Sequence, residues 1–420
     1  MPRLLFLAHR LPYPPDKGEK IRAWHMLDHL ARRWEVELGC LVDDPADLAH
    51  LPVLRARCAA VEARPVGRRT QMGRALLHLR PGRPLTRGWF HEPGLAAWVR
   101  AGLAAGRWDA AFAYSSAMAP YLMGPEAGRA GLRRVLDMVD VDSEKWRAYA
   151  GAARAPMRLV WAREARTLLC LERQAARAFD RSLFVSRAEA ELFARLAPES
   201  AGRLGWVDNG VDVARFDPSQ PRPDPYPDAA PAIVFTGTMS YRPNVEAVTW
   251  FAEAVLPLLR GRDPAPRFVV VGANPAPAVR ALAAQPDVVV TGTVPDVRPY
   301  LAHAAVVVAP LRIARGIQNK VLEAMAMARP VVASPEAFEG VRATPGRDLL
   351  VASGAAETAA RIAEVLDGAH PGLGAAGRAA VAAGHDWSAT LRELDAALDG
   401  GAGGQGWPAH VPVEAAEGVR

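Results

Sequence analysis

The chain is poor in cysteine and in long apolar runs, and each shortage excludes a class of structure. Its 420 residues include only three cysteines, Cys40, Cys58 and Cys170. Their odd number and wide spacing argue against a disulfide framework and against a zinc site, and we expect a reducing cytoplasmic environment. No window holds roughly 18 uninterrupted apolar residues, so the sequence predicts no membrane-spanning helix.

The composition is otherwise apolar and basic. Half of the residues are hydrophobic, which is enough to bury two ordinary cores, and the length predicts about two to three domains. The net charge of +6 fits nucleotide phosphates, an anionic membrane surface or nucleic acid equally well. The opening MPRLLFLAH has an apolar core too short for a signal peptide and favours a buried strand.

The stretch from Ala309 to Ser334 predicts an anion-binding site. It follows an apolar run typical of a buried parallel strand, turns through Arg315 and Gly316, and shows helical periodicity up to Ala328 before Pro330. A strand, a glycine turn and a helix aim unpaired N–H groups and the positive end of the helix dipole at the ligand. That arrangement favours an anion such as a phosphate.

The charged residues of this helix suit the binding of a nucleotide sugar. Lys320 places a positive charge in the first turn beside Gly316 and Asn319, and Glu323 supplies an acceptor for sugar or ribose hydroxyls. Only four of the 51 basic residues are lysines, so a lysine here suggests that a compact ammonium is required. The alternative is a solvated lysine on the helix surface.

The segment GIQNKVLEAMAMARPVV, residues 316–332, also resembles a known family. It is similar to the donor-binding helix of the family 4 glycosyltransferases, and more narrowly to the branch associated with exosortase (PEP-CTERM) exopolysaccharide loci. That family has a Glu, seven residues and a second Glu; here Arg315 holds the first position and Glu323 the second. The resemblance covers about residues 1–398 and implies the α/β GT-B fold, with two Rossmann-like domains of parallel strands facing an interdomain cleft.

A proline-rich segment divides the chain. Residues 217–231 hold six prolines in fifteen positions without apolar periodicity, which is typical of a linker. We therefore predict an N-terminal acceptor domain over 1–216 and a C-terminal donor domain over 232–385. The resemblance implies that a helix at 386–399 crosses back, and residues 400–420 are expected to be a disordered tail. Its GAGGQG is a formal dinucleotide fingerprint, but without a strand before it or a helix after it we reject the match.

The N-terminal domain opens with a strand over 3–9, a loop and a helix over 21–33. Gly18 stands where the loop meets the helix, and only a residue without Cβ lets a substrate approach the backbone closely. The resemblance implies that this loop, with Lys17, Gly18 and Arg22, faces the donor phosphate and the acceptor. An ordinary turn glycine is the alternative.

A strand over 133–139 carries three carboxylates to its C-terminal end: Asp137, Asp140 and Asp142. Chemistry gathers at the C-terminal ends of strands in open α/β sheets, and we expect Asp140 to contact the sugar or the acceptor. The Asp-x-Asp spacing can hold a divalent metal, but the surrounding pattern has the wrong architecture for that motif, so we expect no metal. Asp142 and Ser143 are alternatively N-caps of one helix that runs on to residue 180.

Residues 55–87 form the most basic stretch, with nine arginines against one glutamate, interleaved with Leu76, Leu77 and Leu79. The resemblance implies that the acceptor is received in this part of the chain. Such a patch could dock on anionic lipid, where a lipid-linked acceptor would lie. A solvated, arginine-rich surface is the alternative.

In the donor domain, a strand leads to Gly237, and a helix is expected over 245–260. The family has an Arg and a Lys on the donor diphosphate after this glycine. Here Thr238 takes the first position and Arg242 lies near the second. The loop 291–294, containing Thr293 and Val294, resembles the one over which the nucleotide base lies.

Together these features predict a glycosyltransferase that moves a sugar from a nucleotide-sugar donor to a saccharide acceptor, lipid-linked in our first interpretation. Arg242, Lys320 and the helix N-terminus would neutralise the leaving diphosphate without a metal or other cofactor, and the resemblance implies retention of configuration. A nucleotide-sugar epimerase and a non-catalytic binding subunit are the alternatives. The basic residues are scattered and no aromatic-basic RNA motif occurs, so we expect no nucleic acid partner. The inner face of the plasma membrane is the expected peripheral location.

Overall fold

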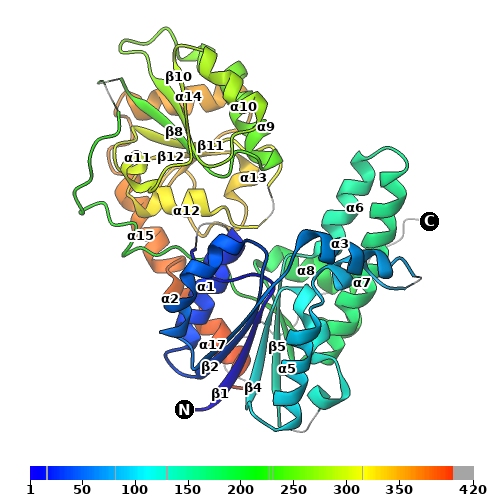
Figure 1. Ribbon diagram of the computed structural model, residues 1–420. Coiled ribbons are helices and arrows are strands. Elements are labelled where there is room, and N and C mark those ends of the chain that lie inside the picture. The colour runs from blue at the N-terminus through cyan, green and yellow to red at the C-terminus, as the bar shows by residue number, and fades with distance from the viewer. Residues whose placement is uncertain are drawn as a thin grey trace. The chain divides into compact units, whose positions relative to one another are not determined.

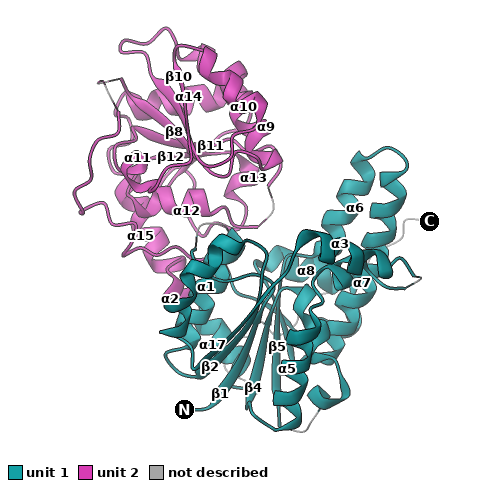
Figure 2. Cartoon of the chain, in the orientation of Figure 1, with its two compact units in different colours: residues 1–208, 391–420 teal, residues 209–390 magenta. Residues whose placement is uncertain are grey.

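The computed structural model describes residues 1–400 except 16–17, 81, 129–130, 227, 229 and 315. The chain forms two compact units, one of residues 1–208 with 391–420 and one of residues 209–390 (Figure 2). Lys17, Arg315 and the segment 401–420, about which the sequence made predictions, lie outside the described residues. Each unit has its own parallel sheet and its own hydrophobic core.

Within the described residues, unit 1 has a seven-stranded parallel sheet in the order β3-β2-β1-β4-β5-β6-β7 (Figure 1). The chain moves outward from β1 to β3 and then returns beside β1, so the strand order reverses between β1 and β4. Leu4 to Ala8 are all buried, because the strand is covered on both faces. The strands are β1 (Arg3–Ala8), β2 (Glu35–Val42), β3 (Ala60–Pro65), β4 (Ala110–Tyr114), β5 (Arg133–Val139), β6 (Arg181–Phe184) and β7 (Leu204–Trp206).

Helices alternate with these strands, as expected for a doubly wound sheet. The helices are α1 (Gly18–Leu30), α2 (Leu51–Arg55), α3 (Arg68–Leu77), α4 (Leu85–Trp89), α5 (Pro93–Ala104), α6 (Asp142–Ala152), α7 (Met157–Ala178), α8 (Arg187–Leu196) and α17 (Arg392–Leu398). None of the helices in the described residues combines the length and the apolar composition that a membrane span requires.

Unit 2 repeats the plan in its described residues with a six-stranded parallel sheet in the order β10-β9-β8-β11-β12-β13. Its strand order reverses between β8 and β11. The strands are β8 (Ala232–Thr236), β9 (Arg267–Val271), β10 (Val288–Gly292), β11 (Val306–Ala309), β12 (Val331–Ala333) and β13 (Leu350–Val351). The helices are α9 (Arg242–Trp250), α10 (Pro277–Ala281), α11 (Arg298–Ala302), α12 (Asn319–Ala326), α13 (Pro335–Phe338), α14 (Gly354–Leu366), α15 (Leu373–Gly384) and α16 (Trp387–Thr390).

Our prediction of one long helix after β5 is wrong. The helix breaks between Ala152 and Met157, and α6 and α7 form a helical hairpin (Figure 1). Ala153 is extended, with φ −96° and ψ 156°. Pro156 has no N–H to donate and disfavours helical backbone in the residue before it. The proline therefore divides a stretch that is otherwise continuous in helical character.

Three smaller differences concern where helices end or change type. The helix expected over 245–260 is α-helical only to Trp250 and continues as a π turn over Phe251–Val255 and a 3-10 turn over Leu256–Leu258. Helix α12 ends before Ala328, whose φ of +52° ends the helical backbone. The expected last helix is divided at Leu391 into α16 and α17.

The boundaries between the units differ from those expected at the proline-rich segment. They fall between Asp208 and Asn209 and between Thr390 and Leu391. The segment 217–231 has neither helix nor strand at its described residues, and it lies within unit 2. Helix α17 is part of unit 1.

Candidate functional site

The candidate site lies at the switch point of unit 2, the place between β8 and β11 where the strand order reverses. Strands β8 and β11 are neighbours, and their chain segments leave the sheet in opposite directions. In open α/β sheets, ligands bind outside the carboxyl ends of the strands at such a point. Gly237 follows β8, and α12, with Lys320, follows β11.

The turn after β8 requires glycine. Gly237 has φ +155°, and a Cβ there would lie 2.7 Å from Nδ2 of Asn244. Gly272, after the neighbouring strand β9, has φ +153°, and its Cβ would lie 1.7 Å from the Gly237 carbonyl oxygen. Two strand ends are therefore packed backbone to backbone, which leaves main chain rather than side chains at this edge of the sheet.

The Lys320 ammonium is held at the same place by two contacts. Its Nζ donates to Oδ1 of Asn244 at 2.7 Å and lies 4.7 Å from the centroid of the Phe235 ring at the end of β8. The N-cap residue of α12, Gln318, makes no side-chain capping bond. The first N–H groups of a helix have no partner within it, so Lys320 and the start of α12 together favour an anion.

Burial shifts the titration of both charged residues of α12. It lowers the pKa of Lys320 to about 8, against the opposing effect of the Glu323 carboxylate. Burial also raises the pKa of Glu323 to about 7, although the positive charges of Lys320 and Arg215 oppose that rise. The lysine stays mainly protonated at neutral pH, but its charge is poorly solvated and would be stabilised by a bound phosphate.

Asn244 is a site residue that sequence reasoning missed. Its side chain is 4% exposed, and besides accepting from Lys320 it donates through Nδ2 to the Thr238 carbonyl at 3.0 Å. It thus joins the glycine turn after β8 to the lysine of α12. A buried asparagine in the first turn of α9 is not distinguishable from an ordinary helix-start residue in the sequence.

The other predicted donor residues lie around this centre or farther along the same edge. Gly316, in the turn that leads into α12, has φ +65°, and Oδ1 of Asn319 accepts a 3.4 Å bond from Asn209. Arg242 starts α9, where it forms an ion pair with Glu246 at 2.6 Å. Thr293 and Val294 follow β10, the edge strand of the sheet, two strands away from β8.

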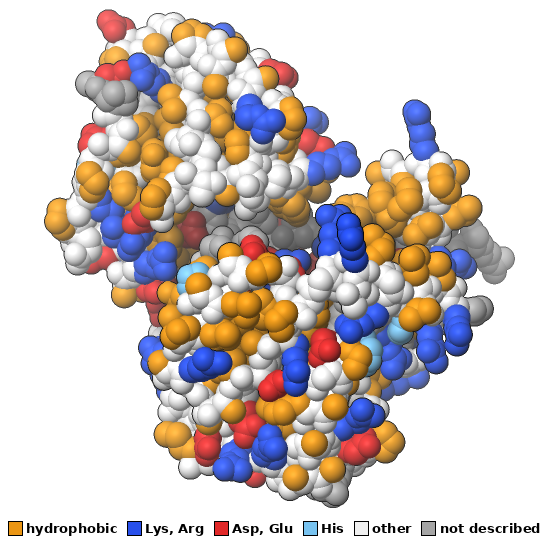
Figure 3. All heavy atoms as spheres, viewed as in Figure 1, with side chains coloured by type: hydrophobic (Ala, Val, Ile, Leu, Met, Phe, Trp, Pro, Cys, Tyr) orange, Lys and Arg blue, Asp and Glu red, His pale blue; other side chains and the backbone are white. Residues whose placement is uncertain are grey.

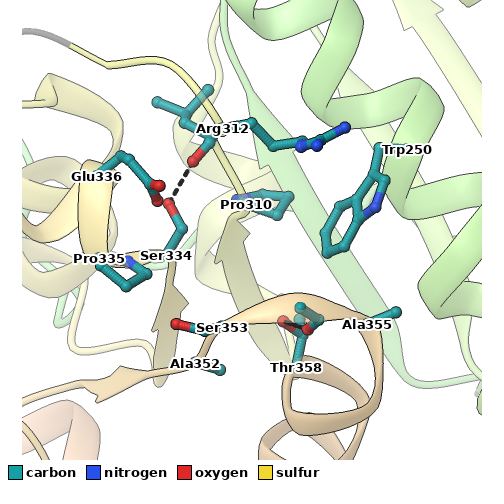
Figure 4. Close-up of a pocket in the computed structure, with 12 residues that line it drawn as sticks. Trp250, Pro310, Arg312, Ser334, Pro335, Glu336, Ala352, Ser353, Ala355 and Thr358 are labelled. Carbon is teal, nitrogen blue, oxygen red and sulfur yellow. Dashed lines mark hydrogen bonds between the residues drawn. The ribbon is translucent and has the colours of Figure 1, made fainter.

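A separate pocket of about 400 Å³ opens in unit 2 beyond the ends of β11, β12 and β13 (Figure 4). Trp250 of α9 forms one wall, and Arg312 and Glu336 bring opposite charges to the rim. The Ser334 hydroxyl donates to the Leu311 carbonyl at 2.6 Å, which joins the chain segments that follow β11 and β12. The pocket is lined by Pro310, Leu311, Arg312 and Ser334 of the stretch 309–334, but by none of the residues predicted to bind the donor.

In unit 1, Gly18 and Arg22 lie in different environments. A Cβ at Gly18 would meet nothing within 4 Å, so the backbone at the start of α1 is open. Arg22, which we expected to face the substrate, is instead fully buried. Its Nε donates to Asp137 at 2.7 Å and its Nη1 donates to the Val207 carbonyl at 2.7 Å, so it joins α1 to the ends of two strands.

Backbone strain gathers where β4 and β5 end. Ser115 has φ +81° and Val139 has φ +67°, conformations that are costly for residues with a side chain and rare for a β-branched one. The Ser115 N–H donates to the Asp137 carbonyl at 2.7 Å, so the two positions are adjacent. Such strain is characteristic of functional sites, and the sequence pattern gave no sign of it.

Asp140 follows this strained turn. Burial, together with the nearby Glu189 carboxylate, raises the pKa of Asp140 to about 6, although the positive charges of Lys145 and Arg22 oppose the rise. A carboxyl that titrates near neutral pH at the end of a strand is suited to exchanging protons or hydrogen bonds with hydroxyl groups.

The capping role suggested for Asp142 and Ser143 is wrong. Val141 is the N-cap of α6, and the Ser143 hydroxyl donates to Glu172 of α7 at 2.5 Å. Burial raises the pKa of Asp142 and of Glu172, to about 6 and about 8. In the part of the chain that the structure describes, no group of three His, Cys, Asp or Glu side chains is arranged to hold a metal ion.

Comparison with known proteins gives the class. Residues 230–368, which lie within unit 2 (209–390), match the family described as Glycosyl transferases group 1. Solved glycosyltransferases of the GT-B fold match the chain over nearly its whole length, and both of its sheets are parallel. The protein is a glycosyltransferase with the GT-B fold. No curated protein sequence matches the chain significantly.

Three solved structures illustrate the likeness, which at these identities shows the fold alone. Sucrose-phosphate synthase from Thermosynechococcus elongatus has 16% identity and a TM-score of 0.69 over 94% of this chain and 98% of its own. HepE of Anabaena, in complex with UDP-glucose, has 13% identity and a TM-score of 0.64 over 95% and 100%. A trehalose 6-phosphate synthase from Burkholderia multivorans has 11% identity and a TM-score of 0.62 over 95% and 99%.

Proposed function

We propose that this enzyme transfers a sugar from a nucleotide-sugar donor, bound at the switch point of unit 2, to a saccharide acceptor attached to a polyprenyl diphosphate. The acceptor would be received by unit 1. The reaction would retain the anomeric configuration and use no metal ion. The match to Glycosyl transferases group 1 and the UDP-glucose bound by HepE, a protein of similar fold, support a nucleotide-sugar donor.

The contact between Lys320 and Asn244 carries this proposal. Departure of a nucleoside diphosphate develops negative charge, and charges and dipoles fixed in advance stabilise that charge best. The 2.7 Å bond to Asn244 fixes the ammonium beside the start of α12. The depressed pKa of Lys320 means that its charge gains from a diphosphate partner. Glu323, one turn later, would accept hydrogen bonds from ribose or sugar hydroxyls.

The acceptor side of the proposal depends on Asp140. Its carboxyl, with a pKa near 6, would hold a hydroxyl of the acceptor or of the transferred sugar. The leaving diphosphate itself would take the proton of the attacking hydroxyl, which is consistent with retention without a protein nucleophile. We further propose that the product belongs to exopolysaccharide or cell-surface glycan synthesis, as the resemblance of residues 316–332 to exosortase-associated transferases suggests.

A thermal-shift screen against uridine, guanosine and thymidine sugar nucleotides tests the donor site. A ligand that binds the folded state raises the unfolding temperature by mass action, and we expect one base to stand out. Lys320→Ala should remove the shift, whereas Arg361→Ala should keep it. Arg361 is an arginine of unit 2 that pairs with Glu364 on α14, so this control also removes one positive charge.

Turnover distinguishes the proposal from its alternatives. With donor and a polyprenyl-diphosphate saccharide, we expect release of nucleoside diphosphate and an extended glycan, also in the presence of EDTA. An altered sugar nucleotide formed without acceptor would indicate an epimerase. Donor binding without turnover on any lipid-linked acceptor would indicate a binding subunit.

A further inference from the structure

Exposed apolar side chains are concentrated on one part of unit 1. Thirteen large hydrophobic residues are exposed in the described part of the chain, and seven of them lie on two segments. Met72, Leu76, Leu77 and Leu79 belong to α3 and the turn after it, where Leu77 is 71% exposed. We call the segments 68–80 and 145–163 together the basic apolar face.

The second segment is the α6–α7 hairpin. Tyr149 is 40%, Met157 44% and Leu159 71% exposed. Figure 3 shows hydrophobic side chains over this hairpin and a basic side chain at its tip. Apolar side chains grouped at the end of a hairpin are unusual on a freely solvated surface and mark an interaction site.

Hydrogen bonds join the two segments through α7. Nη2 of Arg163 donates to the carbonyls of His78, Arg80 and Arg83 at 3.0, 2.7 and 3.0 Å. Oε2 of the neighbouring Glu164, which is 2% exposed, accepts from the Leu85 N–H at 2.7 Å. The hairpin and the α3 segment are therefore fixed side by side within unit 1, as Figure 1 also shows.

The charge of the basic apolar face has one sign. Residues 68–80 and 145–163 contain nine basic residues and neither Asp nor Glu. At the base of the hairpin, Arg147 pairs with Glu144 at 3.1 Å and Lys145 lies 4.0 Å from Asp142. Arg154, in the hairpin turn, and Arg158, at the start of α7, are exposed. An acidic surface complements this face, and a second copy of the same face would be repelled by it.

Aromatic rings complete the pattern. Tyr149 contacts Trp146 on α6 at 5.8 Å between ring centroids and Trp161 on α7 at 5.7 Å. Tryptophan and tyrosine favour the boundary between lipid headgroups and acyl chains. Basic side chains near the surface of an anionic leaflet each add about fivefold in affinity.

We propose that the basic apolar face docks on a bilayer containing anionic lipid, with the tip of the α6–α7 hairpin and the leucines of α3 entering the headgroup region. This inference rests on the proposed function, in that a polyprenyl-linked acceptor lies in a membrane. Residues 55–87 thus supply only part of the docking surface, and the hairpin supplies the rest.

Vesicle binding by the full-length protein tests the inference. The protein is sedimented with vesicles of phosphatidylcholine alone and with vesicles containing about 30% phosphatidylglycerol, whose negative surface potential attracts basic side chains. We expect binding only to the anionic vesicles, weakened by salt. The double variant Leu77→Ser/Leu159→Ser should bind at least about 30-fold more weakly, since it removes two apolar side chains from the contact.

Leu258→Ser is the matched control, because Leu258 is 57% exposed in unit 2 and lies outside the face. It should bind vesicles as the wild type does. Circular dichroism should show both variants folded, and brominated lipids should quench tryptophan fluorescence in the wild type more than in the double variant. Absence of binding to anionic vesicles, or equal binding by the double variant, would overturn the inference.

The two proposals fail separately. The thermal shift with nucleotide sugar reports on unit 2 and should be the same in the double variant. Loss of vesicle binding with an intact shift supports the docking surface alone. Vesicle binding by a protein that transfers no sugar would leave the docking surface standing and remove the proposed function.

Discussion

Replacing Lys320 by alanine tests the centre of the proposed donor site. Its ammonium is fixed in advance by the 2.7 Å bond to Asn244 and lies over Phe235, so little reorganisation is needed when charge develops on the leaving diphosphate. Losing one such preorganised partner costs about 2.7–4 kcal/mol in the transition state. Lys320→Ala should therefore lower kcat by roughly 100- to 1,000-fold.

The assay follows nucleoside diphosphate release at saturating acceptor, using the donor that gives the largest thermal shift. Lys320→Arg keeps the charge, but its planar guanidinium cannot repeat the compact contact with Asn244, so we expect an intermediate loss. Arg361→Ala should turn over as the wild type does. A folded Lys320→Ala enzyme with turnover within about threefold of the wild type, far from the loss expected of such a partner, would show that the diphosphate is bound elsewhere.

Three further predictions concern titration, the acceptor side and the buried ion pair. Because burial lowers the pKa of Lys320 to about 8, its charge is lost as pH rises through that value. The kcat/KM for the donor should then fall about tenfold per pH unit, and a profile flat to about pH 9.5, well above this pKa, would contradict it. Asp140→Asn should lower kcat about 10- to 100-fold, the scale of losing one hydrogen bond to a charged group, with donor affinity by calorimetry unchanged; an equal loss of donor affinity would show that Asp140 does not hold the acceptor. Arg22→Met leaves the Asp137 carboxylate buried without its charged partner, so it should lower the free energy of unfolding measured in urea by about 3–5 kcal/mol. Arg22→Met/Asp137→Leu should recover part of that free energy. An unchanged free energy of unfolding in Arg22→Met would refute the stabilising role of the ion pair.

The strands, and the residues that lie together at the centre of the proposed donor site, could be picked out from the sequence because their signals are local. Uninterrupted apolar runs such as Leu4 to Ala8 fit parallel strands buried on both faces, and the structure has strands there. Lys320 stood out because lysine is rare in this chain, and Gly237 because a strand ends immediately before it.

The missed residues depend on contacts between distant segments. Asn244 matters because it bridges Thr238 and Lys320, which is 76 positions away. Arg22 looked accessible beside Gly18, but its partner Asp137 is 115 positions along the chain. The strain at Ser115 and Val139 arises from how neighbouring strands end, which propensity does not encode. The break before Met157 was visible as Pro156, yet the helical periodicity on both sides outweighed it in our interpretation.

The division of unit 1 between the two ends of the sequence has a consequence for biosynthesis. Helix α17 supplies Asp395 to His29 and Arg33 and the Ala397 carbonyl to Arg133, yet the 182 residues of unit 2, 209–390, are translated before it. The ribosome thus releases the last helix of the first-made sheet only after the whole second sheet has emerged. A nascent chain truncated before residue 391 would expose the apolar surface of unit 1 that α17 otherwise covers. Chaperones act on such exposed surfaces during synthesis.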